Sequence, residues 1–166
     1  MLEARGDLAT SGARHREAAE VAEGIGEVDA IAAHMAHAAM LSMALDDDGA
    51  AAACAERAGR WAREVGQESW AVVVTALEGT LALRARPAAS HVPSIVLAVE
   101  RLEGRPGQQA MAIELLSRAH HALGDPPAAA RTLERAAQRA ETAGLRSYAR
   151  RLRERSALLD AVRSPT

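Results

Sequence analysis

The sequence contains no phenylalanine, no lysine and no asparagine, and only 2% of its 166 residues are aromatic. The absence of lysine excludes a Schiff-base mechanism and a phosphate-binding P-loop, because both need a lysine ammonium group. The single cysteine, Cys54, excludes an internal disulfide and a zinc site built from cysteines. We therefore expect a reducing compartment, the cytoplasm.

Long apolar runs are also missing. No run could span a membrane, and the N-terminal segment lacks the apolar core of a signal peptide. The 20 basic and 22 acidic residues give a formal net charge of -2 and are interspersed along the chain. We expect no long-range field of one sign, no direct nucleic-acid binding and no membrane association.

Alanine dominates the 49% hydrophobic fraction. It is the best helix former, and its small side chain lets helix axes approach closely, whereas a sheet favours Val, Ile, Tyr and Thr. The length suits a single domain with a substantial core. The composition therefore predicts one all-α domain over residues 1–166.

Two stretches align without gaps when Ala44 is placed on Ala122: ALDDDGAAAACAERAGRWAREVGQESWA (44–71) and ALGDPPAAARTLERAAQRAETAGLRSYA (122–149). The alignment places Gly66 on Gly144 and Trp70 on Tyr148, two of the three aromatic residues in the chain. Because these residues are rare here, the match is more than shared alanine and indicates an internal repeat.

Four glycines, Gly26, Gly66, Gly104 and Gly144, stand at nearly equal intervals of about 40 residues, a spacing typical of helical repeats. Each follows a stretch with helical periodicity, and glycine is typical just after a helix C-terminus. A second break precedes each of them, at Gly6-Asp7, 46–49, 84–87 and 124–127, and Pro93 falls inside one predicted helix. Asp, Gly and Pro are typical of turns and helix starts. Helices are predicted near 10–24, 28–44, 48–64, 69–83, 89–103, 108–122, 127–142 and 146–162.

The pattern resembles the tetratricopeptide repeat family, whose unit is a helix-turn-helix of about 34 residues or somewhat more. In AIELLSRAHHALGDPPAAARTLERAAQRA, Leu116-Ser117, the turn at Gly124-Asp125, and Ala129, Leu133 and Ala136 match the packing positions of that family. The resemblance implies an α-solenoid of about four antiparallel helix pairs. Its last helix, 146–162, would be a polar cap in which Leu152, Leu158, Leu159 and Val162 cover the last pair.

The Ala/Arg/Leu-rich style and the long repeat unit resemble repeats in large bacterial ATP-dependent transcriptional regulators. The nucleotide-binding motif of those proteins is missing here, so we expect either a fragment of a larger regulator or a short repeat protein.

No motif in the chain predicts catalysis, a metal site or a cofactor. His34, His37, Met40 and Met43 share a helix spacing that could bind a soft metal. Packing of these side chains in a core or groove is the favoured interpretation, because methionine fills irregular gaps and no carboxylate or cysteine completes the ligand set.

Other polar clusters also have a structural interpretation. The run of Asp46, Asp47 and Asp48 indicates a helix cap rather than a calcium loop, and Cys54 a small buried residue. His120 is assigned to packing, whereas the adjacent His121 points elsewhere on the helix.

In the family geometry the first helix of each pair lines a concave groove. Carried onto this sequence, the groove would be apolar at one end and charged at the other, with Arg118 or Arg151 holding a carboxylate. The predicted partner is a peptide or protein domain, and the role regulatory or scaffolding. The alternatives are a sensor that binds a small molecule or signal peptide in the same groove, inter-repeat packing of these residues, and self-association through the uncapped N-terminal pair. The least favoured alternative is an enzyme that uses histidines, His37 or His121, on the helical scaffold. The predicted groove residues are Met40, Met43, Val73, Thr80, Met111, Glu114, Arg118, His121 and Arg151.

Overall fold

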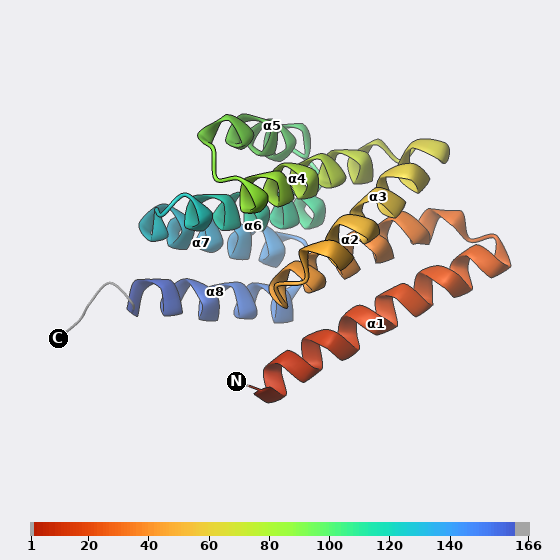
Figure 1. Cartoon of the computed structure of the whole chain (residues 1–166), viewed down its shortest axis with the longest axis horizontal. Helices are drawn as coiled ribbons and strands as arrows, with labels where there is room; N and C mark the ends of the chain where they lie inside the picture. Colours follow the sequence, from red (N-terminus) through yellow and green to blue (C-terminus); the bar gives the residue numbers. More distant parts are fainter. Residues whose placement is uncertain (1, 162–166) are drawn as a thin grey trace. The chain divides into compact units, whose positions relative to one another are not determined.

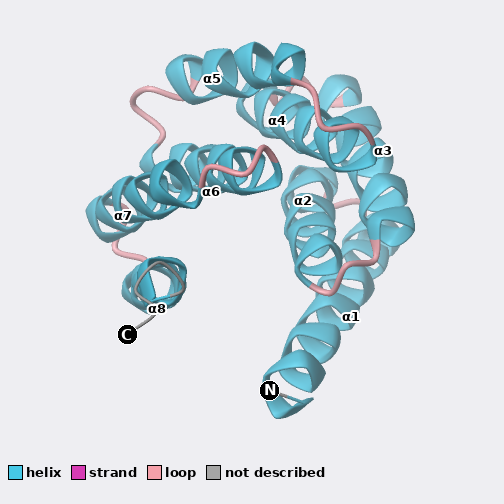
Figure 2. Ribbon diagram, turned by 60° about the vertical axis from the view of Figure 1, so that its left-hand side comes forward, coloured by secondary structure: helices cyan, strands magenta, loops and turns pink. Residues whose placement is uncertain are grey.

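The computed structural model describes the backbone of residues 2–161 and the side chains of residues 7–159, and this part of the chain is helical without a strand. Eight α-helices are joined by short turns (Figures 1 and 2). The prediction of an all-α chain is therefore confirmed. The helices are α1 (Leu2–Ile25), α2 (Val28–Ala44), α3 (Asp48–Glu64), α4 (Glu68–Ala85), α5 (Val92–Arg101), α6 (Pro106–Ala122), α7 (Pro126–Thr142) and α8 (Arg146–Ala161), with a 3-10 turn at Ala89–His91 before α5.

Two predicted helix boundaries were wrong. Helix α1 begins at Leu2 and continues through Gly6, where a break was expected. A single glycine costs a helix only about 1 kcal/mol, and the alanine, leucine and charged neighbours of Gly6 favour the helix. Helix α5 begins at Val92, so that Pro93 lies in its first turn rather than in its interior. There the missing proline N–H removes no intrahelical hydrogen bond.

Tight left-handed turns end the helices where the sequence predicted them. Gly26, Gly66, Gly104 and Gly144 all have positive φ values, between 70° and 85°. Gly124 and Asp46 occupy the turns between them, with φ values of 78° and 62°. Because each turn is short, the helices that it joins run antiparallel, which gives the helix-turn-helix pairs.

The shift that places Ala44 on Ala122 recurs in the helix boundaries. Helices α2 and α6 have identical lengths, as do α3 and α7, and the same shift relates their first and last residues. The predicted aspartate cap is confirmed and also recurs: Asp47 Oδ1 accepts a 2.9 Å hydrogen bond from Ala50 N, and Asp125 Oδ1 accepts one of 2.9 Å from Ala128 N. The two stretches are therefore equivalent in backbone structure as well as in sequence.

The chain divides into two compact units, Met1–Leu81 and Ala82–Thr166, with the boundary inside α4. In the first unit α2 packs against α1 and α3, and Gly59 of α3 lies close to Val74 of α4. In the second unit α6 packs against α5 and α7, and α8 packs against α7. That the whole chain acts as one domain stays a prediction.

Alanines form much of the buried surface. In α2, Ala32, Ala36, Ala38 and Ala39 are fully buried, beside the larger Ile31, Met35 and Met43. The single cysteine, Cys54 of α3, is buried as expected. Small side chains at the contacts let neighbouring helices pack closely, which explains how a chain almost without aromatic residues forms a core.

Helix α8 covers its neighbours with fewer leucines than predicted. Leu152 is buried and Leu159, two turns later on the same helix face, is half-buried. Leu158 is 67% exposed and does not cover the last pair, because a single residue step turns a side chain by about 100° around the helix. Val162 lies outside the described residues.

No helix within the described residues is long and apolar enough to cross a lipid bilayer.

Two glycines at the end of α1 allow the energetic effect of backbone strain to be measured apart from that of side-chain packing. A Cβ added to Gly24 or to Gly26 would meet no other atom within 4 Å, but only Gly26 has a positive φ, of 76°. We expect Gly26→Ala to lower the free energy of unfolding by about 1 kcal/mol. Gly24→Ala should raise it by up to about 1 kcal/mol, because alanine is the better helix former. Urea unfolding followed by circular dichroism measures both; shifts in the same direction would contradict the left-handed turn.

Candidate interaction surfaces

The nine residues predicted to line a groove differ in exposure. Arg118 is half-buried, and His121 and Arg151 are exposed. Thr80 is buried, and its hydroxyl donates a 2.8 Å hydrogen bond to Ala76 O within its own helix. Their role in partner binding stays a prediction. The buried members are Met40, Met43, Val73, Thr80, Met111 and Glu114.

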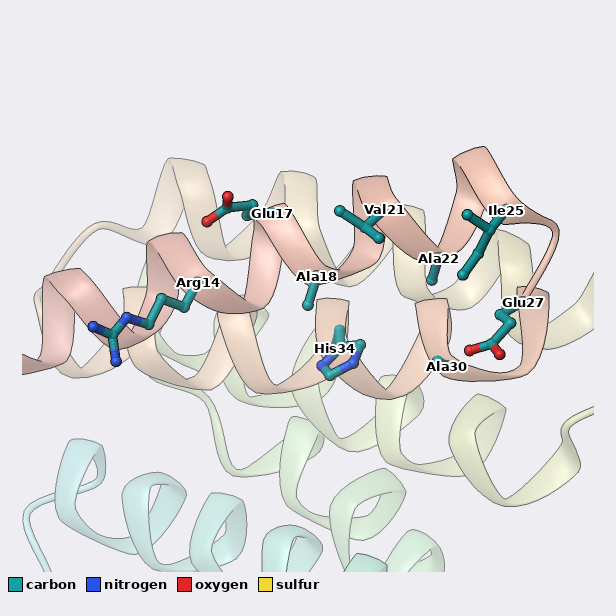
Figure 3. A pocket seen from close by; sticks show the side chains of 9 residues that line it. All are labelled: Arg14, Glu17, Ala18, Val21, Ala22, Ile25, Glu27, Ala30 and His34. Carbon is teal, nitrogen blue, oxygen red and sulfur yellow. The ribbon is translucent and has the colours of Figure 1, made fainter.

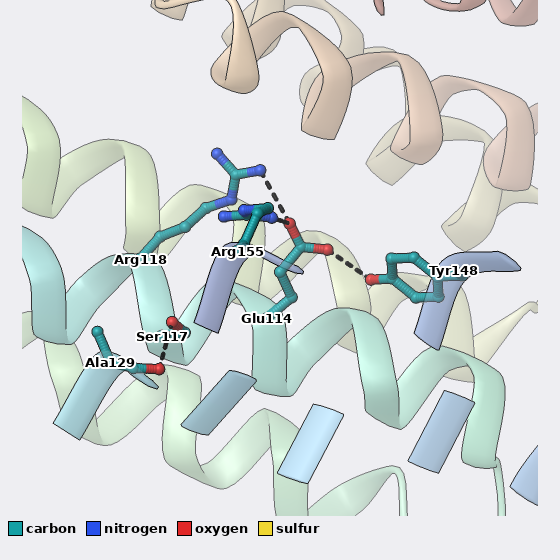
Figure 4. Close-up of polar contacts among 6 residues, drawn as sticks. All are labelled: Glu114, Ser117, Arg118, Ala129, Tyr148 and Arg155. Atoms are coloured by element: carbon teal, nitrogen blue, oxygen red, sulfur yellow. Dashed lines mark hydrogen bonds and ion pairs between the residues drawn. The ribbon is translucent and has the colours of Figure 1, made fainter. Parts of the chain in front are cut away.

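Among these residues, the carboxylate of Glu114 is buried on α6 and accepts hydrogen bonds from three side chains (Figure 4). Arg118, one turn later, donates to Glu114 Oε1 at 2.9 Å. From α8, the Tyr148 hydroxyl donates to Oε2 at 2.5 Å, and Arg155 donates to Oε1. Two cations and one hydroxyl therefore converge on one carboxylate and connect α6 to α8.

The same contacts set the charge states of Glu114 and Tyr148. Burial by itself would raise the pKa of Glu114, but the charges of Arg155 and Arg118 and the hydrogen bonds from Tyr148 and Arg155 outweigh it and lower the pKa to about 2. Burial, and then the Glu114 carboxylate, raise the pKa of Tyr148 well above its usual value. Glu114 is therefore ionised and Tyr148 protonated throughout the neutral range.

Serine hydroxyls fix the register of the three last helices. Ser117 Oγ donates to the carbonyl oxygen of Ala129 at 2.8 Å and connects α6 to α7 (Figure 4). Ser156 Oγ donates to that of Ala130 at 3.0 Å and connects α8 to α7. Both bonds are buried. Helices α6, α7 and α8 are therefore held to one another by specific bonds in addition to apolar packing.

Three arginine side chains, those of Arg118, Arg151 and Arg155, bring positive charge to this side of the second unit. Arg151 is exposed, and its guanidinium carbon lies 5.9 Å from the centre of the Tyr148 ring, a cation–π distance. Arg118 uses one nitrogen for Glu114, and its buried Nε has no hydrogen-bond partner. Arg118 and Arg155 thus contact the carboxylate, and Arg151 contacts the ring of Tyr148. We call Glu114, Arg118, Tyr148, Arg151 and Arg155 the α6–α8 arginine face.

A histidine cluster lies in the first unit. His15 Nδ1 of α1 is 3.1 Å from His34 Nδ1 of α2, and the His15 ring stacks on that of His37 with centroids 5.1 Å apart. His37 Nδ1 donates to Ala33 O at 2.8 Å, and its ring lies 5.9 Å from that of Trp70. Within the described residues, no group of three His, Cys, Asp or Glu is arranged to hold a metal ion. The cluster is therefore a packed and hydrogen-bonded contact between helices.

Sequence reasoning missed His15, Tyr148 and Arg155. All three reach their partners from a helix distant in the sequence. Only the pair Glu114 and Arg118, one turn apart on one helix, follows from helical spacing. The repeat alignment indicated that Tyr148 is an important position, but an alignment does not say which residue Tyr148 contacts.

No protein-family model matches the chain, and the search of curated proteins finds no similar sequence.

The histidine cluster predicts a loss of stability in mild acid. Burial, and then the charges of His37 and His34, lower the pKa of His15 below 6.5. A group with a lowered pKa in the folded state stabilises the fold fully above its unfolded pKa, and this contribution is lost as the pH falls through the folded pKa. We therefore expect the free energy of unfolding to decrease below about pH 6.5, and to decrease less in His15→Gln.

Urea unfolding of both proteins from neutral to mildly acidic pH measures this difference. His120→Gln, at a half-buried histidine of the second unit, is the matched control and should keep the wild-type pH dependence. An unchanged pH dependence in His15→Gln would contradict the assignment.

Proposed function

We propose that the chain is a non-catalytic, tetratricopeptide-like interaction module. Its first helices of each pair, α2, α4, α6 and α8, would line the surface of an α-solenoid that binds an acidic peptide or partner domain. The role would be regulatory or scaffolding, in the cytoplasm.

The repeated helix-turn-helix pair supports this proposal. Each pair buries its apolar side against the next helix, as α6 does on α7 and α7 on α8. In repeat proteins of this kind the surface of the stack, rather than a cavity, is the part that functions. The equivalence of residues 28–64 and 106–142 supports a repeat built twice from one pattern.

The observation that carries the choice of partner is the α6–α8 arginine face. Arg118 and Arg155 neutralise Glu114, and Arg151 is then exposed as an additional cation. Guanidinium groups bind carboxylates through paired hydrogen bonds, and Arg118 still has a buried Nε without a partner. An acidic side chain or a C-terminal carboxylate of a peptide fits this face better than a basic or apolar one.

The charge states of this face favour binding over catalysis. A general acid or base at neutral pH needs a pKa near the operating pH. The pKa of Glu114 is about 2, and that of Tyr148 lies well above its usual value, so neither group exchanges a proton at neutral pH. Their shared hydrogen bond instead holds the carboxylate to which Arg118 and Arg155 donate.

Peptide selection tests the proposal. A displayed library of random twelve-residue peptides is panned against the wild type and against Arg118→Glu/Arg151→Glu. We expect the wild type to enrich acidic peptides, whose affinity by fluorescence anisotropy falls about tenfold or more in the variant and falls with added salt. Arg131→Glu/Arg135→Glu reverses two exposed arginines of α7, with the same change of net charge, and should bind like the wild type.

Equal binding by the variant with reversed arginines, or enrichment of basic peptides, would contradict the proposal. Each protein is first shown to have the same helical circular dichroism, so that unfolding is not mistaken for loss of binding.

A further inference from the structure

Helices α1 and α2 leave a shallow apolar pocket of about 340 Å³ between them (Figure 3). Its floor consists of Ala18, Ala22 and Ala30, and His34 lines it from α2 between Arg14 and Ala30. Two large apolar side chains at the edge, Val21 and Ile25, are 57% and 66% exposed. The remaining lining residues are Arg14, Glu17 and Glu27, so the edge of the pocket is charged.

The repeat identifies the equivalent place in the second unit. The turn after α1 has hydrogen bonds from Gly26 N to Glu23 O and from Glu27 N to Ala22 O. The turn after α7 has the same two bonds at the equivalent positions, from Gly144 N to Glu141 O and from Leu145 N to Ala140 O. The same two bonds also recur in the turns after α2, α3 and α6. The α1–α2 hairpin is aligned with the α7–α8 hairpin because Gly26 and Gly144 belong to one series of positive-φ glycines spaced by about 40 residues.

A helix covers that equivalent hairpin. Helix α6 packs on α7 and bonds to α8 through Glu114, and Gly107 at its start lies close to Leu145 and Ala143. Ala136 and Ala140, which correspond to Ala18 and Ala22, are fully buried. In the second unit, the place that corresponds to the α1–α2 pocket is therefore covered by α6.

Helix α8 is of the α6 type. Gly104 and Gly144, both with positive φ, precede α6 and α8, and each helix begins at the second residue after its glycine. Glu154 of α8 then corresponds to Glu114 of α6, and the exposed Arg151 to Met111. A second copy of this chain therefore carries a helix with the backbone register that the pocket accepts.

Charge favours the same occupant. No arginine occurs between Arg16 and Arg57, a segment whose acidic residues are Glu17, Glu20, Glu23, Glu27, Asp29, Asp46, Asp47, Asp48 and Glu56. Helix α8 is mostly basic, with Arg146, Arg150, Arg151, Arg153 and Arg155 against Glu154 and Asp160. Arg153 and Arg155 pair with glutamates of their own copy, so Arg151 is the exposed cation considered below. The expectation of evenly interspersed charge does not hold for these two segments.

We propose that the chain self-associates head to tail, with α8 of one copy seated in the α1–α2 pocket of the next. In the second unit, Ser117 of α6 is level with Ala129 of the antiparallel α7. We place α8 of one copy where α6 lies, by aligning Gly144 on Gly104, and α1 of the next copy where α7 lies, by aligning Gly26 on Gly144. Ala157 of the first copy is then level with Ser11 of the next. The same register places Arg151 level with Glu17, two residues of opposite charge.

This contact joins two different surfaces, so it leaves one pocket and one α8 open in every dimer and allows chains to grow. The apolar edge formed by Val21 and Ile25 would be covered in each contact. The association should therefore increase with protein concentration and weaken with added salt.

Sedimentation velocity of the full chain at rising concentration tests the proposal. We expect Glu17→Arg and Arg151→Glu each to weaken association by about tenfold or more, because each places like charges opposite one another. An equimolar mixture of the two variants should regain association, since the mixture contains intact Arg151 on one copy and intact Glu17 on the other. The double variant should regain it as well. Glu100→Arg and Arg131→Glu should associate like the wild type.

A wild-type chain that stays monomeric up to about 1 mM, where even weak protein contacts are populated, would overturn the proposal. So would single variants that associate normally, or a mixture that gains nothing, because a symmetric contact of α1 with α1 gives that result. Glu17 lies outside the α6–α8 arginine face, so Glu17→Arg should lose self-association and keep peptide binding, while Arg118→Glu should lose peptide binding first. The two proposals therefore fail separately.

Discussion

The buried carboxylate of Glu114 is the contact on which the second unit depends. It accepts hydrogen bonds from Arg118 on its own helix and from Tyr148 and Arg155 on α8, so it joins α6 to α8 and neutralises the cations beside it. A buried ionic group of this kind costs desolvation energy, and removing one partner leaves charge uncompensated. The orientation of the arginines, and with it the proposed recognition of acidic peptides, follows from this carboxylate.

The relation of α6 to α7 and α8 also explains the first unit. The same turns and the same helix lengths recur along the chain, so a hairpin that is covered in one place indicates what would cover its equivalent elsewhere. The α1–α2 hairpin, whose pocket has the exposed side chains of Val21 and Ile25 at its edge, is such a hairpin. Peptide recognition by the arginines and self-association through α8 are therefore two proposed uses of one repeated packing pattern.

Much of the helical framework could be predicted from sequence, because left-handed turns require particular residues. The glycine spacing predicted α2 and α3 with the bounds that the structure has. Gly6 and Pro93 misled the prediction, since the cost of a glycine within α1 is small and a proline is harmless in the first turn of α5. The partners of Glu114 on α8, and His15 opposite His34, could not be predicted, because the sequence does not say which helices touch. The acidic segment before Arg57 was missed because charge was judged over the whole chain.

The most direct test of this account is the pKa of Glu114, measured by carbon-detected NMR of its side-chain carboxyl as the pH is lowered. If two arginines and a tyrosine hold the buried carboxylate, it stays ionised down to a pKa of about 2, well below the usual glutamate value of about 4.5. The same titration of Arg155→Met, which removes one of the two cations, should move the pKa upward. A pKa at or above 4.5 for Glu114 in the folded wild type would contradict the account.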